Sequence, residues 1–323
     1  MKKLFVLLCL LSVGSLASTN HRVDSHAPIG IMADHSHKKG EAMISIRTMP
    51  MTMTDNYNGS KKISISDIHS SYMMAPKEMT MGMTMVGGMM GLNDKITLTG
   101  MIGHNNKNMI MVNQMNSEIE TSSNGIGDAK LGAIFSIQDD NQMRLLWNAG
   151  LSIPIGSINE KNNNGDTLPY AMQLGSGTYD ISLGATAVRF FDQYSIGGQL
   201  TGLFRTGKNN HNYRLGNEYQ LTTWGQRHLN TQVSATLRST LRIKTDITGS
   251  DTTVSAMKAS MSPGYSTTTG AMSGELSVGL NVKPDQFKSS RFAVEYTLPV
   301  VQKTDSIAMG RGSYLTAGYQ HNL

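Results

Sequence analysis

The chain has 323 residues, of which 39% are hydrophobic and 16% charged, and its net charge is +5 at pH 7. Glycine is abundant, with 33 residues, whereas proline, with 8, is scarce, a composition that suits a secreted all-β protein or a membrane β-barrel. The positive charge is modest and scattered, so it does not indicate a nucleic-acid partner.

Residues 1–17 are predicted to be a signal peptide. Lys2 and Lys3 precede an apolar run that ends at Leu11, and Ser15 and Ala17 are small residues at the two positions that a signal peptidase reads. The run is too short for a helix that spans a bilayer, which needs about 20 residues. Because the single cysteine, Cys9, lies in this run, we expect the mature chain to be stabilised by packing or by a membrane and not by disulfides.

From Gly125 to the end of the chain, apolar and polar residues alternate persistently with a period of two. In 144–155, for example, Leu145, Trp147 and Leu151 fall on one face and Asn148 and Ser152 on the other. One apolar and one polar face is what a strand between lipid and a wet lumen requires. Twelve strands are predicted near 41–54, 78–91, 95–104, 126–137, 142–155, 178–191, 193–205, 212–224, 229–244, 270–283, 289–300 and 312–323.

The segments that connect these strands alternate between short and long. Those at 92–94, 139–141, 192 and 284–288 are tight, whereas 55–77, 105–125, 156–177 and 245–269 are long and polar. Such segregation is typical of outer-membrane barrels, whose short turns are periplasmic and whose long loops lie outside the cell. The sequence therefore predicts an all-β, antiparallel up-and-down transmembrane β-barrel of about 12 strands over 41–323, preceded by a periplasmic N-terminal segment, 18–40. A secreted soluble β-protein is the alternative.

The predicted location, the outer membrane of a Gram-negative bacterium, implies lipid and lipopolysaccharide as surroundings. Leu315, Ala317, Tyr319 and Leu323 share one face of the last strand. This is a weak form of the terminal signal that the barrel-assembly machinery reads.

Several stretches resemble a family of outer-membrane barrels named for the MetA pathway of phenol degradation, whose members are often labelled transporters. The matching stretches are His26–Gly30 with Met32 and Asp34–His35, Lys39–Glu41, Gly125–Leu131, Leu151–Ile158 and, most specifically, Leu168–Asp180. The resemblance covers roughly residues 26–190 and implies a barrel that moves small molecules. It supplies no catalytic residues, and the segment near Ala42 is poorer in aromatic residues than the family pattern.

Methionine is concentrated in the first strands, since 17 of the 24 methionines lie between Met32 and Met115. Many of them recur with period two, which places each set on one face of a strand. Thioethers are soft ligands that prefer Cu(I), and His26, His69 and His104 are further nitrogen donors. The candidate copper ligands are His35, His37, Met49, Met51, Met53, Met79, Met81, Met83 and Met85.

The competing interpretation is that methionine is adaptable apolar filler on the lipid face. Parity leaves the matter open. In the first strand the methionines share parity with Ser45 and Arg47, which favours the lumen. In the second strand the opposite face is Thr80, Gly82 and Thr84, which favours methionines that point outward.

The polar faces of the later strands carry charges that we expect to line the pore: Lys130, Arg144, Arg205, Arg238, Arg242, Glu275 and Glu295. Ordinary pairing of opposite charges inside a narrow barrel is the simpler reading of the set. Twelve strands enclose a narrow interior that side chains or the N-terminal segment could largely fill, so a non-conducting barrel is a rival to a channel.

The expected function is a channel or transporter for small solutes, with no enzymatic activity and no certain cofactor. An envelope copper-handling barrel is the alternative. A barrel-borne lipid hydrolase is a second one, which would need a Ser, a His and an orienting Asn or Asp on the outer face. His211 and His228 lie near strand ends, but no G-x-S-x-G pattern surrounds a serine.

Overall fold

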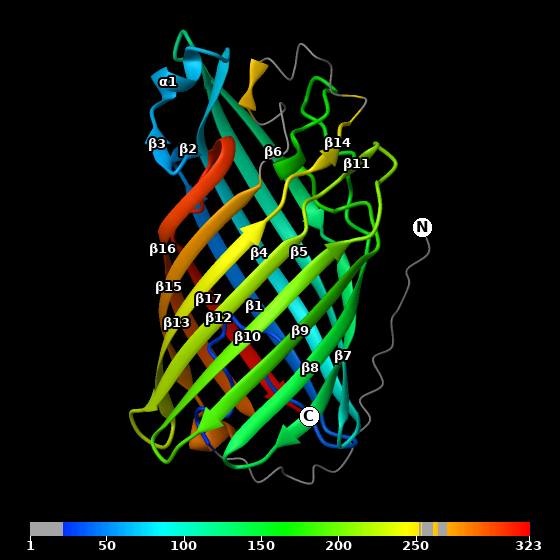
Figure 1. Cartoon of the computed structure of the whole chain (residues 1–323), viewed down its shortest axis with the longest axis vertical. Helices are drawn as coiled ribbons and strands as arrows, with labels where there is room; N and C mark the ends of the chain where they lie inside the picture. Colours follow the sequence, from blue (N-terminus) through cyan, green and yellow to red (C-terminus); the bar gives the residue numbers. More distant parts are fainter. Residues whose placement is uncertain (1–21, 252, 254–260, 264–269) are drawn as a thin grey trace.

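The computed structural model describes residues 22–251, 253, 261–263 and 270–323, so the predicted signal peptide, 1–17, lies outside the described residues. Within them, twelve long antiparallel strands form one barrel wall (Figure 1). These strands are β1 (Ala42–Met53), β4 (Met74–Asn93), β5 (Ile96–Asn113), β7 (Ala129–Asp139), β8 (Met143–Ile153), β9 (Asp180–Phe190), β10 (Tyr194–Arg205), β12 (Glu218–His228), β13 (Val233–Lys244), β15 (Ala271–Val282), β16 (Ser290–Met309) and β17 (Tyr314–Asn322). No helix among the described residues is long and apolar enough to cross a membrane.

Each strand pairs with its neighbour in the chain, and the pairing of β1 with β17 closes the ring. The remaining elements are short or lie beyond the ring. They are β2 (Asn56–Gly59), β3 (Lys61–Ile63), α1 (Ile65–His69), β6 (Glu118–Ile126), η1 (Tyr170–Met172), β11 (Tyr213–Arg214), β14 (Thr248–Gly249) and η2 (Asp285–Phe287). The predicted all-β antiparallel barrel of about twelve strands is confirmed.

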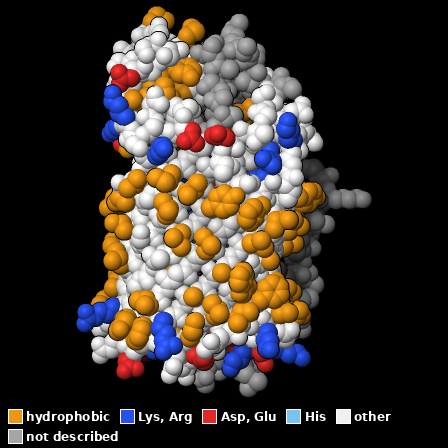
Figure 2. Space-filling model, viewed as in Figure 1, with side chains coloured by type: hydrophobic (Ala, Val, Ile, Leu, Met, Phe, Trp, Pro, Cys, Tyr) orange, Lys and Arg blue, Asp and Glu red, His pale blue; other side chains and the backbone are white. Residues whose placement is uncertain are grey.

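The wall is apolar outside and polar inside, the reverse of a soluble protein. Leu200, Val278 and Trp147 are 59%, 58% and 57% exposed, whereas Thr97 and Glu275 are buried. On the face that Figure 2 shows, apolar side chains form a broad belt across the middle of the wall, with charged residues along its lower edge. A closed barrel satisfies its backbone hydrogen bonds within the wall, and an outer apolar band matches the hydrocarbon of a membrane. The protein therefore has the architecture of an outer-membrane barrel.

Short turns gather at one end of the barrel and long segments at the other (Figure 1). One predicted loop is wrong, because 105–125 is mostly strand: β5 runs to Asn113, and β6 pairs back against it. The predicted strand at 212–224 is shifted to β12, and the one at 289–300 extends to Met309 in β16. Strands that continue past the membrane have no lipid-facing side, so they need not show the alternation on which the prediction depended.

Residues 22–41, which we call the plug, enter the short-turn end of the barrel, where 22–37 are mostly buried and 38–40 are exposed. From residue 22 to residue 37, the predicted periplasmic segment 18–40 is thus enclosed by the wall. Val23, Ile29 and Ile31 are each 2% exposed. Side chains from strands around the ring hydrogen-bond to the plug backbone, as described below, so the plug occupies the lumen at this end.

Candidate functional site

The plug is held by side chains of the wall that donate to its backbone carbonyl groups. Arg47 Nη1 of β1 donates to the carbonyl oxygens of Ile29 and Ile31, both at 2.8 Å. The corresponding donors on other strands are Arg144 to Ser25 (2.6 Å), Gln199 to Met32 (2.7 Å), Gln226 to His26 (2.9 Å) and Arg291 to Ala27 (2.5 Å). These polar contacts satisfy carbonyl groups that the plug, which forms no strand, leaves unpaired.

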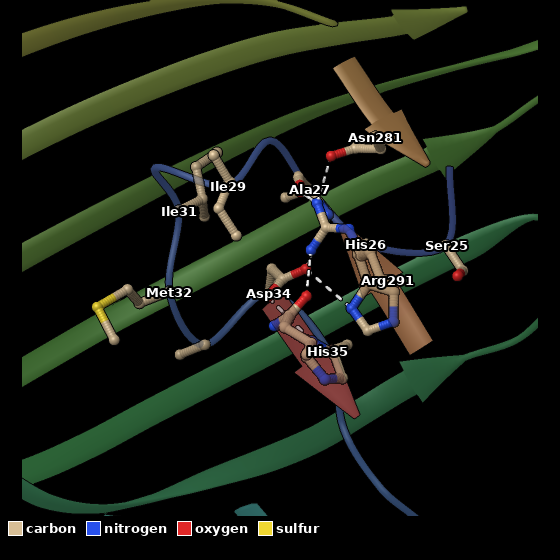
Figure 3. A network of polar contacts seen from close by, with 12 residues as sticks. Ser25, His26, Ala27, Ile29, Ile31, Met32, Asp34, His35, Asn281 and Arg291 are labelled. Atoms are coloured by element: carbon tan, nitrogen blue, oxygen red, sulfur yellow. Dashed lines mark hydrogen bonds and ion pairs between the residues drawn. The ribbon is translucent and has the colours of Figure 1, made fainter. Parts of the chain in front are cut away.

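Three side chains of the plug bring metal-ligating atoms together. His26, Asp34 and His35 each offer a ligand atom, and these atoms lie within 4.8 Å of one another. His35 Nδ1 lies 2.9 Å from Asp34 Oδ1, and His26 Nδ1 lies 3.9 Å from Asp34 Oδ2. Figure 3 shows both imidazoles beside the Asp34 carboxylate, with Arg291 and Asn281 above them. The predicted ligand His37 is close by, since its ring centroid is 5.0 Å from that of His35.

Burial and neighbouring charges fix the protonation of this cluster. Burial, followed by the nearby His35 and Arg291, holds the pKa of His26 well below its usual 6.5. Burial, with His35, lowers the pKa of His37 to about 3. Burial alone would raise the pKa of Asp34, but the charge and hydrogen bond of His35, with His26 and Arg291, lower it well below 3.8. At neutral pH, His26 and His37 are therefore neutral and Asp34 is an anion.

The predicted methionine rows share one face and point into the lumen. In the register of β1 with β4, Met49 lies opposite Met83, Met51 opposite Met81 and Met53 opposite Met79. Opposed residues in an antiparallel pair lie on the same face. Met51 and Met79 are buried, whereas the alternate residues Ile46 and Val86 are 45% and 53% exposed on the outer wall. The outward orientation that parity favoured for the second strand is wrong, because Thr80, Gly82 and Thr84 take the outer face there.

A long segment at the other end of the barrel folds onto these methionines. Leu168 and Met172, from the predicted loop 156–177, pack in one cluster with Met51, Met53, Met74, Met79, Met109, Met111 and Tyr314. Lys107 Nζ donates to the carbonyl oxygens of Ala171 and Gln173, at 2.8 and 2.6 Å. The cluster therefore closes part of the lumen at the end opposite the plug.

Asp128 connects two of the stretches that resemble the family, Leu151–Ile158 and Leu168–Asp180. Its carboxylate accepts hydrogen bonds from the backbone N–H groups of Gly156 and Ser176, at 3.1 and 2.9 Å. A Cβ on Gly175 would lie 2.3 Å from the Gly156 carbonyl oxygen, so a side chain there would prevent this approach. These hydrogen bonds thus hold the two ends of the segment 156–177 next to the start of β7.

The predicted pore-lining charges lie on the inner side of the wall, and most are paired. Arg205 bonds to Asp180, Arg238 to Glu295, and Glu275 to Arg311 and Tyr314. Arg144 bonds to Asp139 as well as to the plug. Arg242 differs, because its Nε is buried without a hydrogen-bond partner. Lys130 is exposed, within electrostatic reach of Glu218.

The residues suggested for a hydrolase are engaged in other contacts. His228 Nε2 lies 2.7 Å from Asp24 of the plug, and His211 lies between Asn159 and Asp251 in the outer segments. Ser290 Oγ is 3.0 Å from His321 Nδ1, but no Asp, Glu or Asn hydrogen-bonds to His321 in the part of the chain that the structure describes. These contacts assemble no Ser–His–acid arrangement.

Sequence reasoning identified His26, His35 and Asp34 but not the residues that surround them. Arg47, Gln199 and Arg291 lie in predicted strands, whereas Gln226 lies beyond the end of the predicted strand 212–224. Their common role depends on the plug passing between opposite walls, which no local pattern reveals. The nearest signal in the sequence was the His26–Gly30 stretch, because it matches the family pattern although it precedes the first strand. Such a match indicates that this segment packs against the barrel.

Comparison with known proteins agrees with this architecture. Residues 89–296 match the model of the family described as "Putative MetA-pathway of phenol degradation". The crystal structure of an outer membrane channel from Pseudomonas putida F1 superimposes with a TM-score of 0.64 at 12% identity, covering 90% of this chain and 98% of that one. The NanC porin (TM-score 0.43, 9% identity, 87% and 100% coverage) and a Pseudomonas aeruginosa FadL homologue (0.42, 8%, 87% and 90%) are more distant. No curated protein matches the sequence.

Proposed function

We propose that this chain, which belongs to the MetA-pathway family, is an outer-membrane channel for small solutes that combine an apolar body with an anionic or hydroxyl group. The observation that carries the proposal is the asymmetry of the lumen. The inner faces of β1, β4 and β5 carry methionines, whereas those of β9 to β16 carry Arg205, Arg238, Arg242, Glu275 and Glu295. A solute of this kind would place its apolar part on the thioethers and its polar group on the charged wall.

Arg242 is the residue that we assign to the anionic group. The other predicted arginines of this wall are matched by carboxylates, while Arg242 keeps one N–H without a partner. A buried donor left unpaired costs about 1–3 kcal/mol, which a passing carboxylate or phenolate would offset. Binding at this position must stay weak for a solute to leave again.

The test is single-channel recording of the purified protein in planar bilayers. We expect conductance with a preference for anions, block by benzoate at lower concentration than by acetate, and loss of the anion preference in Arg242→Gln. Changing Met81, Met83 and Met85 together to Thr should remove the advantage of benzoate over acetate. The lipid-facing Met90→Thr is the matched control. A barrel that conducts no ions even after removal of the plug would contradict the channel function.

A second candidate, Cu(I) binding by the methionines, rests on their cross-strand pairs. Opposed side chains have Cβ atoms about 4.5–5.5 Å apart, so one soft ion could bridge two thioethers. Changing Met79, Met81, Met83 and Met85 to Leu should keep the fold, because Leu replaces Met at similar volume. Lower Cu(I) affinity in the folded quadruple variant would support this function, and unchanged affinity would leave these side chains as packing.

The envelope partners follow from the same architecture. We propose that residues 1–17 direct export, that the barrel-assembly machinery recognises the terminal strand β17, and that lipopolysaccharide and lipid surround the apolar belt. Fractionation should recover the mature protein in the outer membrane, as a species whose gel mobility changes on heating. Recovery as a soluble periplasmic protein would contradict the last two, whereas recovery in the cytoplasm would contradict the first.

A further inference from the structure

The plug carries a cluster of imidazoles whose hydrogen-bonding capacity the fold does not use. His26 Nδ1, His35 Nε2 and His37 Nε2 are all buried without a hydrogen-bond partner. His35 and His37 are 5% and 6% exposed. Buried polar atoms are normally paired, so three unpaired ring nitrogens in one small region require an explanation. The contacts between plug and wall do not involve these nitrogens, because the wall side chains donate to the backbone carbonyl groups of the plug.

We propose that His26, Asp34 and His35 form a binding site for a divalent transition-metal ion, with His37 beside it as a further ligand. Zn²⁺ is the representative ion. This inference goes beyond the channel function and does not depend on conduction.

The separations of the ligand atoms suit such an ion. Zinc lies about 2.0–2.1 Å from its nitrogen and oxygen ligands, so the ligands of a tetrahedral site are about 3.4 Å apart. The distances from the Asp34 oxygens to His35 Nδ1 and His26 Nδ1, 2.9 and 3.9 Å, lie on either side of this value. Small rotations of the side chains therefore suffice. In this arrangement the ion would take the place of the hydrogen bond between His35 Nδ1 and Asp34 and would give His26 Nδ1 a partner, and His35 Nε2 would stay unpaired.

The chemistry of the donors selects the class of ion. Two or three imidazoles with one carboxylate suit zinc, copper or nickel, whereas calcium and magnesium require several oxygen ligands. Arg291, Arg47 and Arg144 add positive charge nearby and weaken the binding of any cation. An ion held here must therefore gain from strong bonds to nitrogen, which again favours the transition metals.

A bound metal ion would connect the two ends of the turn between His26 and Asp34. His26 and the pair Asp34–His35 lie on either side of the turn that contains Ile29 and Ile31, whose carbonyl groups bond to Arg47. An ion that bridges them would stiffen this turn in the shape that fits the wall. The expected consequence is a plug that leaves the lumen less often when metal is bound.

The experiment is isothermal titration of Zn²⁺ into the full mature barrel, folded in detergent and purified without a polyhistidine tag. We expect one equivalent per chain, with affinity at least tenfold lower in His26→Gln and in His35→Gln. His104→Gln, which removes an exposed imidazole from the outer wall, should bind as the parent does. Heat-modified gel mobility checks that every variant is folded.

Visible absorption of bound Co²⁺ provides a readout that depends on coordination and not on stability. The parent should show the intense bands of a four-coordinate site, and His35→Gln should lose them. Absence of binding in the parent, or equal binding in the parent and both cluster variants, would overturn the proposal. The unpaired nitrogens would then be attributed to buried water. Equal loss in His104→Gln would also overturn it, because the ion would then bind elsewhere.

Discussion

Replacing Arg47 should release the plug, because this side chain makes two hydrogen bonds to it from one guanidinium nitrogen. Both bonds are 2.8 Å long, and Arg47 is only 7% exposed. Hydrogen bonds to a charged group contribute about 1.5–3 kcal/mol each. Arg47→Met leaves both carbonyl groups buried and unpaired, so plug docking should weaken by about 3–6 kcal/mol. At 1.4 kcal/mol per factor of ten, the displaced population should rise by about two to four powers of ten.

The assay measures this population through a single cysteine at the plug. Ala27 is 5% exposed, so Ala27→Cys should react with a polar thiol reagent only while the plug is displaced. We expect the labelling rate to rise about a hundredfold or more in Arg47→Met, and larger conductance levels to become frequent in planar bilayers. Arg227→Met, which removes an exposed arginine near the short-turn end, is the matched control. Equal labelling rates in Arg47→Met and the parent would refute the reasoning.

Three further predictions concern the membrane, the topology and the outer segments. Leu200 and Leu229 are both 59% exposed, but Leu200 lies in the apolar belt and Leu229 in a short turn. In urea titrations in lipid vesicles, Leu200→Arg should lower the free energy of unfolding by about 2–4 kcal/mol and Leu229→Arg should change it by less than about 1 kcal/mol. Similar losses in the two variants would contradict the assignment of the belt to lipid. An epitope inserted at Asn163 should bind antibody on intact cells, and binding only after permeabilisation would reverse the orientation. Burial works to raise the pKa of Asp251, but hydrogen bonds from Thr253 and His211 lower it below 3.8, so its contacts should persist on acidification and be lost only as the pH falls through that lowered value. Pepsin should then cleave the outer segments in the parent only below pH 3.8, and in Asp251→Asn already above it. Cleavage at the same pH in both would exclude a role for this carboxylate.

The barrel itself could be predicted because the two faces of a membrane strand differ in polarity, so apolar and polar residues alternate in its sequence. Leu145, Trp147 and Leu151 alternate with polar residues since lipid lies on one side and the lumen on the other. This alternation located most strands to within a few residues. It failed beyond the membrane, where no lipid requires an apolar outer face, as in the hairpin of β5 and β6, which was predicted as the loop 105–125.

The direction of the methionine rows was beyond the reach of the sequence. Parity within one strand cannot tell inside from outside when the opposite face is threonine and glycine. The register of β1 with β4, which sets Met51 opposite Met81, places both rows on one face, and ring closure makes that face the lumen. Register is a relation between strands, so it appears only when they pair.

The amino-acid sequence by itself determined three features: the apolar and polar faces of the strands, the segregation of short turns from long connecting segments, and the histidines that precede the first strand. The tertiary structure decided that these histidines lie inside the barrel. A segment without periodicity carries no sign of where it docks, because its backbone bonds to whichever donors surround it. Arg47, Arg144 and Arg291 come from strands far apart in the chain and converge only when the ring closes. The meeting of His26 with Asp34 and His35 follows from that enclosure, since the wall holds the turn that brings them together.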